Sequence, residues 1–147
     1  MKPILFVSLI LSCFAINAQD IVFEKTWIKA VPSSLKMSAM FGILKNKTDK
    51  DIKLISVSGD LAKNIEIHNH IKTNGVMKMR KIPFLLVPAN SQVELKPMHE
   101  HIMFIGLNKK LEIGKSHEFV MNFEGGKTLK ITAEVKKMDD AHKGHHH

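Results

Sequence analysis

From Gln19 onward the chain alternates short β-type segments with turn-forming residues, and no stretch carries an apolar helical stripe of convincing length. Turns are indicated at residues 46–49, 73–75, 88–90 and 125–126. Between them the pattern predicts strands at residues 21–30, 38–45, 52–58, 64–71, 76–81, 92–95, 102–107, 117–123 and 128–136. Short strands with turns about every 8 to 12 residues predict one all-β domain, an antiparallel sandwich or a small barrel.

The N-terminal segment predicts export. Lys2 precedes an apolar run from Ile4 to Ile16, and Ala18 supplies a small residue for cleavage. That run is shorter than the roughly 20 apolar residues that a membrane span needs. We therefore expect a secretory signal peptide at residues 1–18, a domain at residues 19–137 and a periplasmic or secreted protein. A lipoprotein processing site at Cys13, with the acylated cysteine retained, is a second interpretation.

Cysteine and charge exclude several classes of function. The single cysteine, Cys13, lies in the apolar run, so the exported chain would hold no thiol. No disulfide framework is then possible, and a thiol reductase is disfavoured. The formal net charge is +8, but the lysines are scattered through the chain and do not cluster with aromatic residues. This distribution indicates a solvated basic surface and not a nucleic-acid site.

Histidine and methionine crowd into one window of the chain. Its members are His68, His70, Met77, Met79, Met98, His99, His101 and Met103. Side chains two apart on a strand point to one face of the sheet. Each of three short segments therefore presents two potential ligands on a common side. In the segments of His68 and His101 the opposite side carries isoleucines and a phenylalanine that are expected in the core, and in the segment of Met79 it carries Val76, Lys78 and Arg80.

The residue types indicate which ion such a cluster would hold. Thioether sulfur is a soft, neutral ligand that suits Cu(I), and imidazole accepts Cu(I), Cu(II) or Zn(II), so a mixed set favours copper. A type 1 electron-transfer site also needs a cysteine ligand, which is missing. Methionine most often fills gaps in an apolar core, and we assign Met37, Met40 and Met121 to that role. A metal-free β-sandwich interaction module remains an alternative.

The spacing of four of these residues resembles the periplasmic copper chaperones of the PCuAC family. His68, Met79, His101 and Met103 match the family pattern of a histidine, a methionine eleven positions later and His-x-Met twenty-two positions further on. The likeness extends from Trp27 through residues 41–46 to residues 119–124. It implies a cupredoxin-like β-sandwich or Greek-key barrel, and one Cu(I) bound by two imidazole nitrogens and two thioether sulfurs.

The same resemblance implies a function without catalysis. Family members are expected to deliver copper to an acceptor, namely the binuclear copper centre of cytochrome c oxidase, sometimes with a thioredoxin-like copper chaperone as partner. We expect Lys78 and Arg80 to steer an acidic partner toward the site. A copper scavenger or storage protein is the alternative within the same chemistry. A copper oxidase is disfavoured, because the sequence shows neither a substrate pocket nor an open coordination position.

Three further features leave alternatives open. A turn containing Met98 and His99 replaces the glycine-rich turn that is usual before the His-x-Met pair, and these residues are either exposed turn residues or extra ligands. The same ambiguity applies to His70 and Met77. Residues 138–147 read as a flexible tail whose histidines could bind Cu(II) weakly.

Overall fold

The computed structural model describes residues 19–141, so the predicted signal peptide, Cys13 and the last six residues lie outside the described residues. Apart from one helical turn, α1, the described chain is built of strands. The elements are β1 (Ile21–Lys29), β2 (Met37–Asn46), β3 (Ile52–Ser58), β4 (Ala62–Thr73), β5 (Val76–Lys81), β6 (Leu85–Val87), β7 (Ser91–Leu95), β8 (His101–Leu107), β9 (Ser116–Phe123), β10 (Thr128–Lys136) and α1 (Met138–Ala141). No helix within residues 19–141 has the length and apolar character to cross a membrane.

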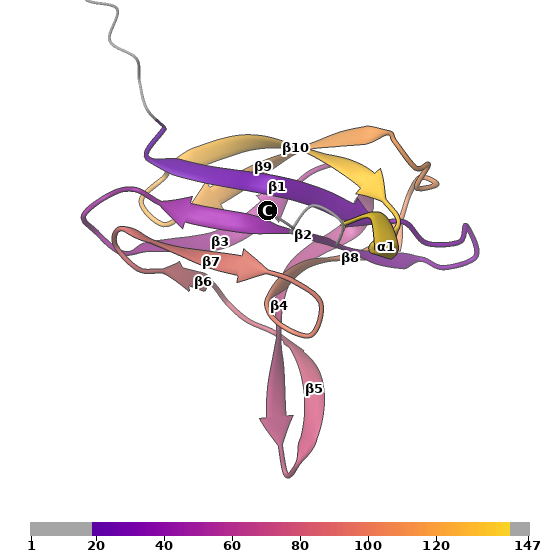
Figure 1. Cartoon of the computed structure of the whole chain (residues 1–147), viewed down its shortest axis with the longest axis horizontal. Coiled ribbons are helices and arrows are strands. Elements are labelled where there is room, and N and C mark those ends of the chain that lie inside the picture. The colour runs from indigo at the N-terminus through magenta and orange to yellow at the C-terminus, as the bar shows by residue number, and fades with distance from the viewer. Residues whose placement is uncertain (1–18, 142–147) are drawn as a thin grey trace, which may run out of the picture.

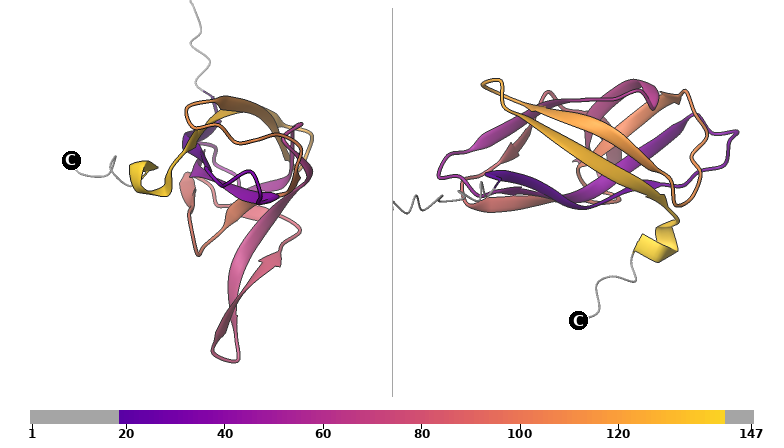
Figure 2. Two further views of the ribbon diagram at one scale, coloured as in Figure 1. Left: turned by 90° about the vertical axis from the view of Figure 1, so that its right-hand side faces the viewer. Right: turned by 90° about the horizontal axis from the view of Figure 1, so that it is seen from above.

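The strands wrap around one interior, as the end-on view in Figure 2 shows. Along the sheet the order is β5-β4-β8-β2-β1-β10-β9-β3-β6, and β7 pairs with the second half of β2. The all-β, cupredoxin-like fold expected from the sequence is confirmed. The β1–β10 pair is parallel, in contrast to the antiparallel neighbours on either side.

The main core lies inside this wrapped sheet. Its fully buried side chains come from most of the strands and include Ile28, Leu44, Leu54, Leu95, Phe104 and Met121. The rings of Phe104 and Phe119 stack with their centroids 5.3 Å apart. Met40 and Met121 are completely buried, which confirms their predicted place in the core.

A β-bulge in β1 creates a second, smaller cluster on the outside of the sheet. The pairing of β1 with β2 shifts between Glu24 and Trp27, and Lys25 takes a positive φ of 52° there. The extra residue reverses the alternation, so that Phe23 and Ile28 point inward whereas Trp27 points outward. Trp27 packs on Phe41 of β2, with ring centroids 4.8 Å apart. We call this group the outer cluster: Trp27, Ala39, Phe41, Met103 and Ile105.

One hairpin leaves the body of the molecule. The first part of β4 pairs with β8, and its last part pairs only with β5. Residues 69–81 thus form a two-stranded ribbon that projects below the body in Figure 1, and we call it the hairpin arm. Its tip is a two-residue turn in which Asn74 and Gly75 both have positive φ, as an Asn-Gly hairpin turn requires.

Two local features differ from the sequence prediction. The short strand β6 was not predicted, because its three residues pair with β3 only at Ile52–Leu54 and offer too few positions for a pattern. Met138–Ala141 form a helical turn, although the tail was expected to be irregular from Met138 onward. Met138 reaches a cavity beside Pro97 and Met98, so tertiary contact orders this start of the tail.

Candidate metal site

Two histidines face each other across neighbouring strands of the body. His68 on β4 and His101 on β8 are direct cross-strand partners, and their ring centroids lie 5.9 Å apart. They point away from the main core, as their parity with Ile67 and Ile102 predicts. Both are nevertheless buried, with 8% and 4% of their surfaces exposed. Phe41 of the outer cluster and Met79 of the hairpin arm lie against His101, and Glu66 lies against His68.

Met103 stands on the same side of β8 as His101, two residues further along. Its side chain is 9% exposed and packs in the outer cluster against Ala39 and Phe41. Phe41 also lies beside the His101 ring, at a centroid distance of 6.2 Å. The bulge in β1 therefore builds an aromatic support beneath the site, which the sequence reading did not find. In the sequence, the bulge can be recognised by the break in the alternation of apolar and polar residues between Phe23 and Ile28.

Met79 reaches the same place from the hairpin arm. It lies opposite His70 in the β4–β5 register, and its Sδ atom is 3.2 Å from Nε2 of His101. Its side chain stays 39% exposed, far more than those of His68, His101 and Met103. The fold thus brings together residues that are separated by up to 35 positions in the sequence, three from the body and one from the arm.

Hydrogen bonds leave one ring nitrogen free on each buried histidine. The carbonyl of His99 can only accept, so Nδ1–H of His101 donates to it at 2.9 Å and the lone pair resides on Nε2. On His68, Nε2 lies 2.8 Å from Oε2 of Glu66, whereas Nδ1 is buried without a hydrogen-bond partner. Burial is the main cause that lowers the pKa of His101, which favours the neutral imidazole that metals bind.

These free nitrogens fit a soft metal ion. A buried acceptor without a partner costs free energy unless something else binds it, and Nδ1 of His68 is such an acceptor. Nε2 of His101 faces a thioether sulfur, which is itself only a weak acceptor. Within residues 19–141 no three His, Cys, Asp or Glu side chains gather closely enough to hold a metal by themselves. Methionine sulfur would have to complete the coordination.

A cavity of about 250 Å³ opens beside His101, and His68 is not among the residues that line it. Met79, His101 and Met103 line it together with His70, Met98 and Met138. Met37 also lines the cavity and is 53% exposed, so its predicted place in the core is wrong. The reason is its position at the start of β2, where its cross-strand partner is Ile105 of the outer cluster and not a residue of the main core.

The four residues that were either extra ligands or surface residues differ in their position relative to the cavity. His70 faces the cavity with its ring 5.5 Å from that of His101. Met98 is 58% exposed at the cavity rim, in a turn where its φ of 67° is positive. His99 takes part through its backbone carbonyl. Met77 lies further out on the arm, opposite Lys72, and is not among the residues that line the cavity.

The basic residues near the site are partly different from those expected. Alternation along β5 places Lys78 and Arg80 on the face of the arm opposite Met79. Lys72 and Lys81 pair across the ribbon with Met77 and His68, on the face that carries Met79. Lys29 lines the cavity itself. Positive charge near the site thus comes from Lys29 and from the face of the arm that carries Met79, whereas Lys78 and Arg80 lie on the opposite face.

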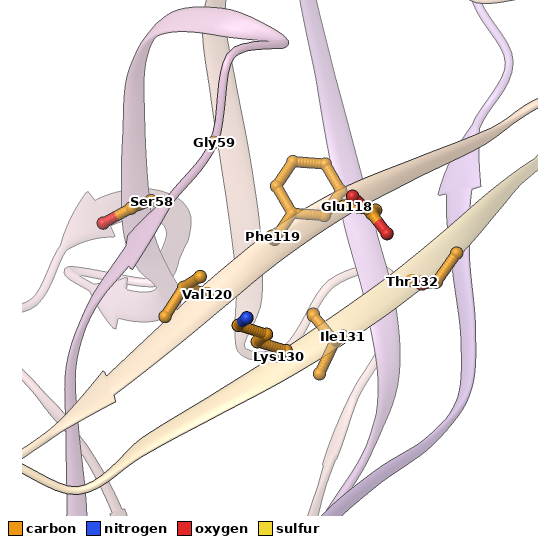
Figure 3. Close-up of a pocket in the computed structure, with 8 residues that line it drawn as sticks. All are labelled: Ser58, Gly59, Glu118, Phe119, Val120, Lys130, Ile131 and Thr132. Carbon is orange, nitrogen blue, oxygen red and sulfur yellow. The ribbon is translucent and has the colours of Figure 1, made fainter.

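A second hollow lies over β9 and β10 and is shown in Figure 3. Glu118 and Lys130 are its charged residues, and Phe119, Val120 and Ile131 contribute apolar surface. It contains neither histidine nor methionine among its lining residues. It therefore lacks the ligand types that the window from His68 to Met103 provides.

Comparison with known proteins assigns the chain to a family. The LpqE-like family model, described as "Putative lipoprotein LpqE-like", matches residues 21–135. The chain belongs to this family. The LpqE-like family is the PCuAC family, as the spacing of the four residues indicated. Among sequence relatives, "Putative lipoprotein Lxx21020" of Leifsonia xyli is 28% identical over 88% of this chain and 77% of its own length.

Solved structures of PCuAC proteins share the fold. The copper-bound PCuAC domain from PmoF2 superimposes with a TM-score of 0.69 at 19% identity, over 80% of this chain and 93% of that domain. The solution structure of CuI-DR1885 from Deinococcus radiodurans is 30% identical, with a TM-score of 0.65, over 77% of this chain and 76% of its own. A second relative, RP573 of Rickettsia prowazekii, is 30% identical over 80% of this chain, which spans 66% of that protein.

Proposed function

We propose that this PCuAC protein is an extracytoplasmic metallochaperone that holds one Cu(I) ion with His68, Met79, His101 and Met103. The observation that carries the proposal is the approach of the Met79 sulfur to within 3.2 Å of the free Nε2 of His101. The unpartnered Nδ1 of the neighbouring His68 supports it. The relative DR1885, whose solution structure is described as its Cu(I) form, supports the choice of ion.

The geometry suggests how the ion would be released. His68, His101 and Met103 are nearly covered, whereas Met79 is 39% exposed at the base of an exposed ribbon. An acceptor that docks here would replace the Met79 sulfur first, because that ligand is neutral, weakly held and within reach. The cations Lys29 and Lys72 would attract an acidic acceptor surface. The binuclear copper site of cytochrome c oxidase is the acceptor we propose, with a thioredoxin-like copper chaperone as an intermediate partner.

The family description supports a location outside the cytoplasm. Lipoproteins are exported, and both the family and the Leifsonia relative carry that description. The apolar run at residues 4–16 is consistent with export through a signal peptide. Anchoring of the chain through Cys13 remains the alternative to a freely soluble exported form.

An anaerobic Cu(I) titration of the chain from residue 19 onward, in competition with a calibrated chelator, tests the proposal. We expect one tightly bound equivalent, and an affinity in Met79→Leu and in His101→Ala that is too low to compete with the chelator. Met77→Leu is the matched control, because Met77 lies on the same strand and face but outside the cavity. No retained copper, or equal binding in all four proteins, would leave a metal-free interaction module.

Transfer distinguishes a carrier from a store. We expect the loaded protein to pass its copper within minutes to an excess of a copper-free acceptor domain of the binuclear type. This transfer should be faster than the release of copper from the loaded protein to a free chelator. A chain that keeps its copper under these conditions would be a storage protein.

We also propose a weaker Cu(II) site in the tail. The tail begins beside the cavity, because Met138 of α1 lines it. Histidines 142 and 145–147 lie outside the described residues, and flexible imidazoles can chelate without preformed geometry. Equal Cu(II) stoichiometry in the full-length and the 1–138 chains would remove this site.

A further inference from the structure

Glu66 lies beneath the candidate site and touches two of its elements at once. It is on β4 two residues before His68, so both side chains share one face, and its cross-strand partner is Met103. One carboxylate oxygen, Oε2, lies 2.8 Å from Nε2 of His68. The other, Oε1, accepts a hydrogen bond of 3.1 Å from Nζ of Lys81 on β5. The carboxylate therefore bridges a ligand of the body and the strand that carries Met79.

The contact with His68 decides which ring nitrogen is free. A carboxylate that already accepts from a lysine ammonium has no proton to donate, so Nε2 of His68 must be the donor. A neutral imidazole that is protonated on Nε2 carries its lone pair on Nδ1. That atom is the one found buried and without a partner. Among described residues Glu66 is the carboxylate that hydrogen-bonds a candidate ligand.

The contact with Lys81 restrains the hairpin arm. Lys81 is the cross-strand partner of His68 and stands two residues after Met79 on the same face of β5. The ion pair thus fastens the base of the arm next to the position from which Met79 reaches His101. The lysine side chain is 64% exposed, and such exposed pairs contribute little to folding stability. Its effect should therefore fall on the position of Met79 more than on the fold.

We propose that Glu66 is a positioning residue of the copper site: it selects Nδ1 of His68 as the metal-binding nitrogen and holds the Met79 strand against the ligand strand through Lys81. This inference rests on the proposed function. It assigns a role that the four-residue pattern does not contain. Carboxylates that accept from the second nitrogen of a ligand histidine orient the ring and raise its basicity. Here the carboxylate also brings a formal negative charge to a set of four neutral ligands.

Three variants separate these roles. Glu66→Ala removes both contacts, and we expect Cu(I) to bind about 10- to 100-fold more weakly, the usual effect of losing such a partner. Glu66→Gln keeps a carbonyl that can accept from Nε2 but loses the charge, so its loss of Cu(I) affinity should be smaller than that of Glu66→Ala. Lys81→Gln removes only the ion pair that holds the arm, so its loss of Cu(I) affinity should be smaller than that of either Glu66 variant. Glu94→Gln is the matched control, because Glu94 pairs with Lys96 and touches no candidate ligand.

Two measurements decide the inference. Long-range ¹H–¹⁵N correlation spectra of the copper-free wild type should show His68 protonated on Nε2, and Cu(I) should shift the Nδ1 resonance. Thermal melting of the variants should superimpose on that of the wild type, so that a weakened affinity is not unfolding. Protonation on Nδ1 in the copper-free chain, or unchanged affinity in Glu66→Ala, overturns the role of Glu66 even if the wild type binds Cu(I). A wild type that binds no Cu(I) overturns the proposed function itself.

Discussion

The body and the hairpin arm are built on opposite principles. In β8, four consecutive side chains from His101 to Phe104 are buried, because one face packs in the main core and the other is covered by the outer cluster. In β5, all six side chains are exposed, and the strand has β4 as its one partner. His68 stands at the junction, paired with His101 on one side and with Lys81 on the other.

This difference separates stability from exchange. The body fixes three candidate ligands in a covered environment, where their rotamers are set by packing and hydrogen bonds. The arm supplies the fourth ligand on an exposed ribbon that adds little buried apolar surface to the fold. Changes in the body should therefore affect folding first, and changes in the arm should affect copper first.

The largest expected effect is on the body. Phe104→Ala should lower the free energy of unfolding by about 3–5 kcal/mol, because it empties a fully buried position that stacks on Phe119. Val76→Ala, at a position that is 56% exposed on the arm, should change it by less than about 0.5 kcal/mol. Urea denaturation of the copper-free proteins measures both. Similar losses in the two variants would show that the arm is part of the folding unit.

The next largest effect is expected in the arm, on Cu(I) affinity and not on folding stability. Met79→Leu keeps the volume of the side chain and removes its sulfur, so Cu(I) affinity should fall by more than about 100-fold. This exceeds the loss that is usual when a residue that only contacts a metal ligand is replaced. Its free energy of unfolding should stay within about 0.5 kcal/mol of the wild type, since the residue is exposed. Chelator competition and urea denaturation are compared on one preparation. A stability loss as large as that of Phe104→Ala would break the division between body and arm.

A smaller effect should sharpen the comparison within the body. Phe41→Leu replaces the aromatic ring beside His101 with a smaller side chain. We expect about a tenfold loss of Cu(I) affinity, at the lower end for substitutions of residues that contact a metal ligand. Phe123→Leu is the control, because Phe123 is equally buried but belongs to the main core. Both should lose a similar amount of stability. An affinity that falls equally in both would mean that general loosening, and not the outer cluster, governs the site.

The smallest effect concerns pH and lies far from the arm. Nε2 of His117 in β9 is buried without a partner, and burial is the first cause that lowers the pKa of this ring, followed by Lys109, while Asp60 opposes it. The unfolded ring binds a proton near pH 6.5. The stability contributed by the neutral ring is therefore complete above that pH and is lost as the pH falls through the lower folded-state pKa.

His117→Gln should accordingly flatten the decline in unfolding free energy between about pH 7 and pH 5 in copper-free protein. Burial lowers the pKa of His101 as well, so part of the decline should persist in the variant. His99→Gln, at an exposed ring, is the control and should decline like the wild type. A His117→Gln profile that is as steep as the control would contradict this account of the buried ring.

Alternation and turn residues were enough to predict most of the fold. The bounds of β3, β5 and β10 agree residue for residue with the sequence prediction, and a clear turn signal precedes each of them. The bulge at Lys25 could not be placed, since the choice between two registers depends on what Trp27 meets across the sheet. The parallel β1–β10 pair joins the two ends of the chain, and no local pattern encodes it.

At the candidate site, the sequence predicted the face of the strand on which three of the residues lie, but not their surroundings. Parity alone places His68, His101 and Met103 on one side of their strands, and the fold confirms that placement. The burial of Met103 and His101 was not predictable, because Phe41, far away in the sequence, packs on Met103 and lies beside the His101 ring. Glu66 carries no ligand pattern of its own, and its role follows only from the register that sets it beside Lys81.

X-ray absorption spectroscopy at the copper edge of the Cu(I)-loaded protein tests the central claim most directly. We predict a first shell of about two sulfur and two nitrogen scatterers, with the sulfur contribution halved in Met79→Leu and in Met103→Leu. A shell of nitrogen and oxygen alone, or a sulfur contribution that neither substitution reduces, would contradict the assignment of this site.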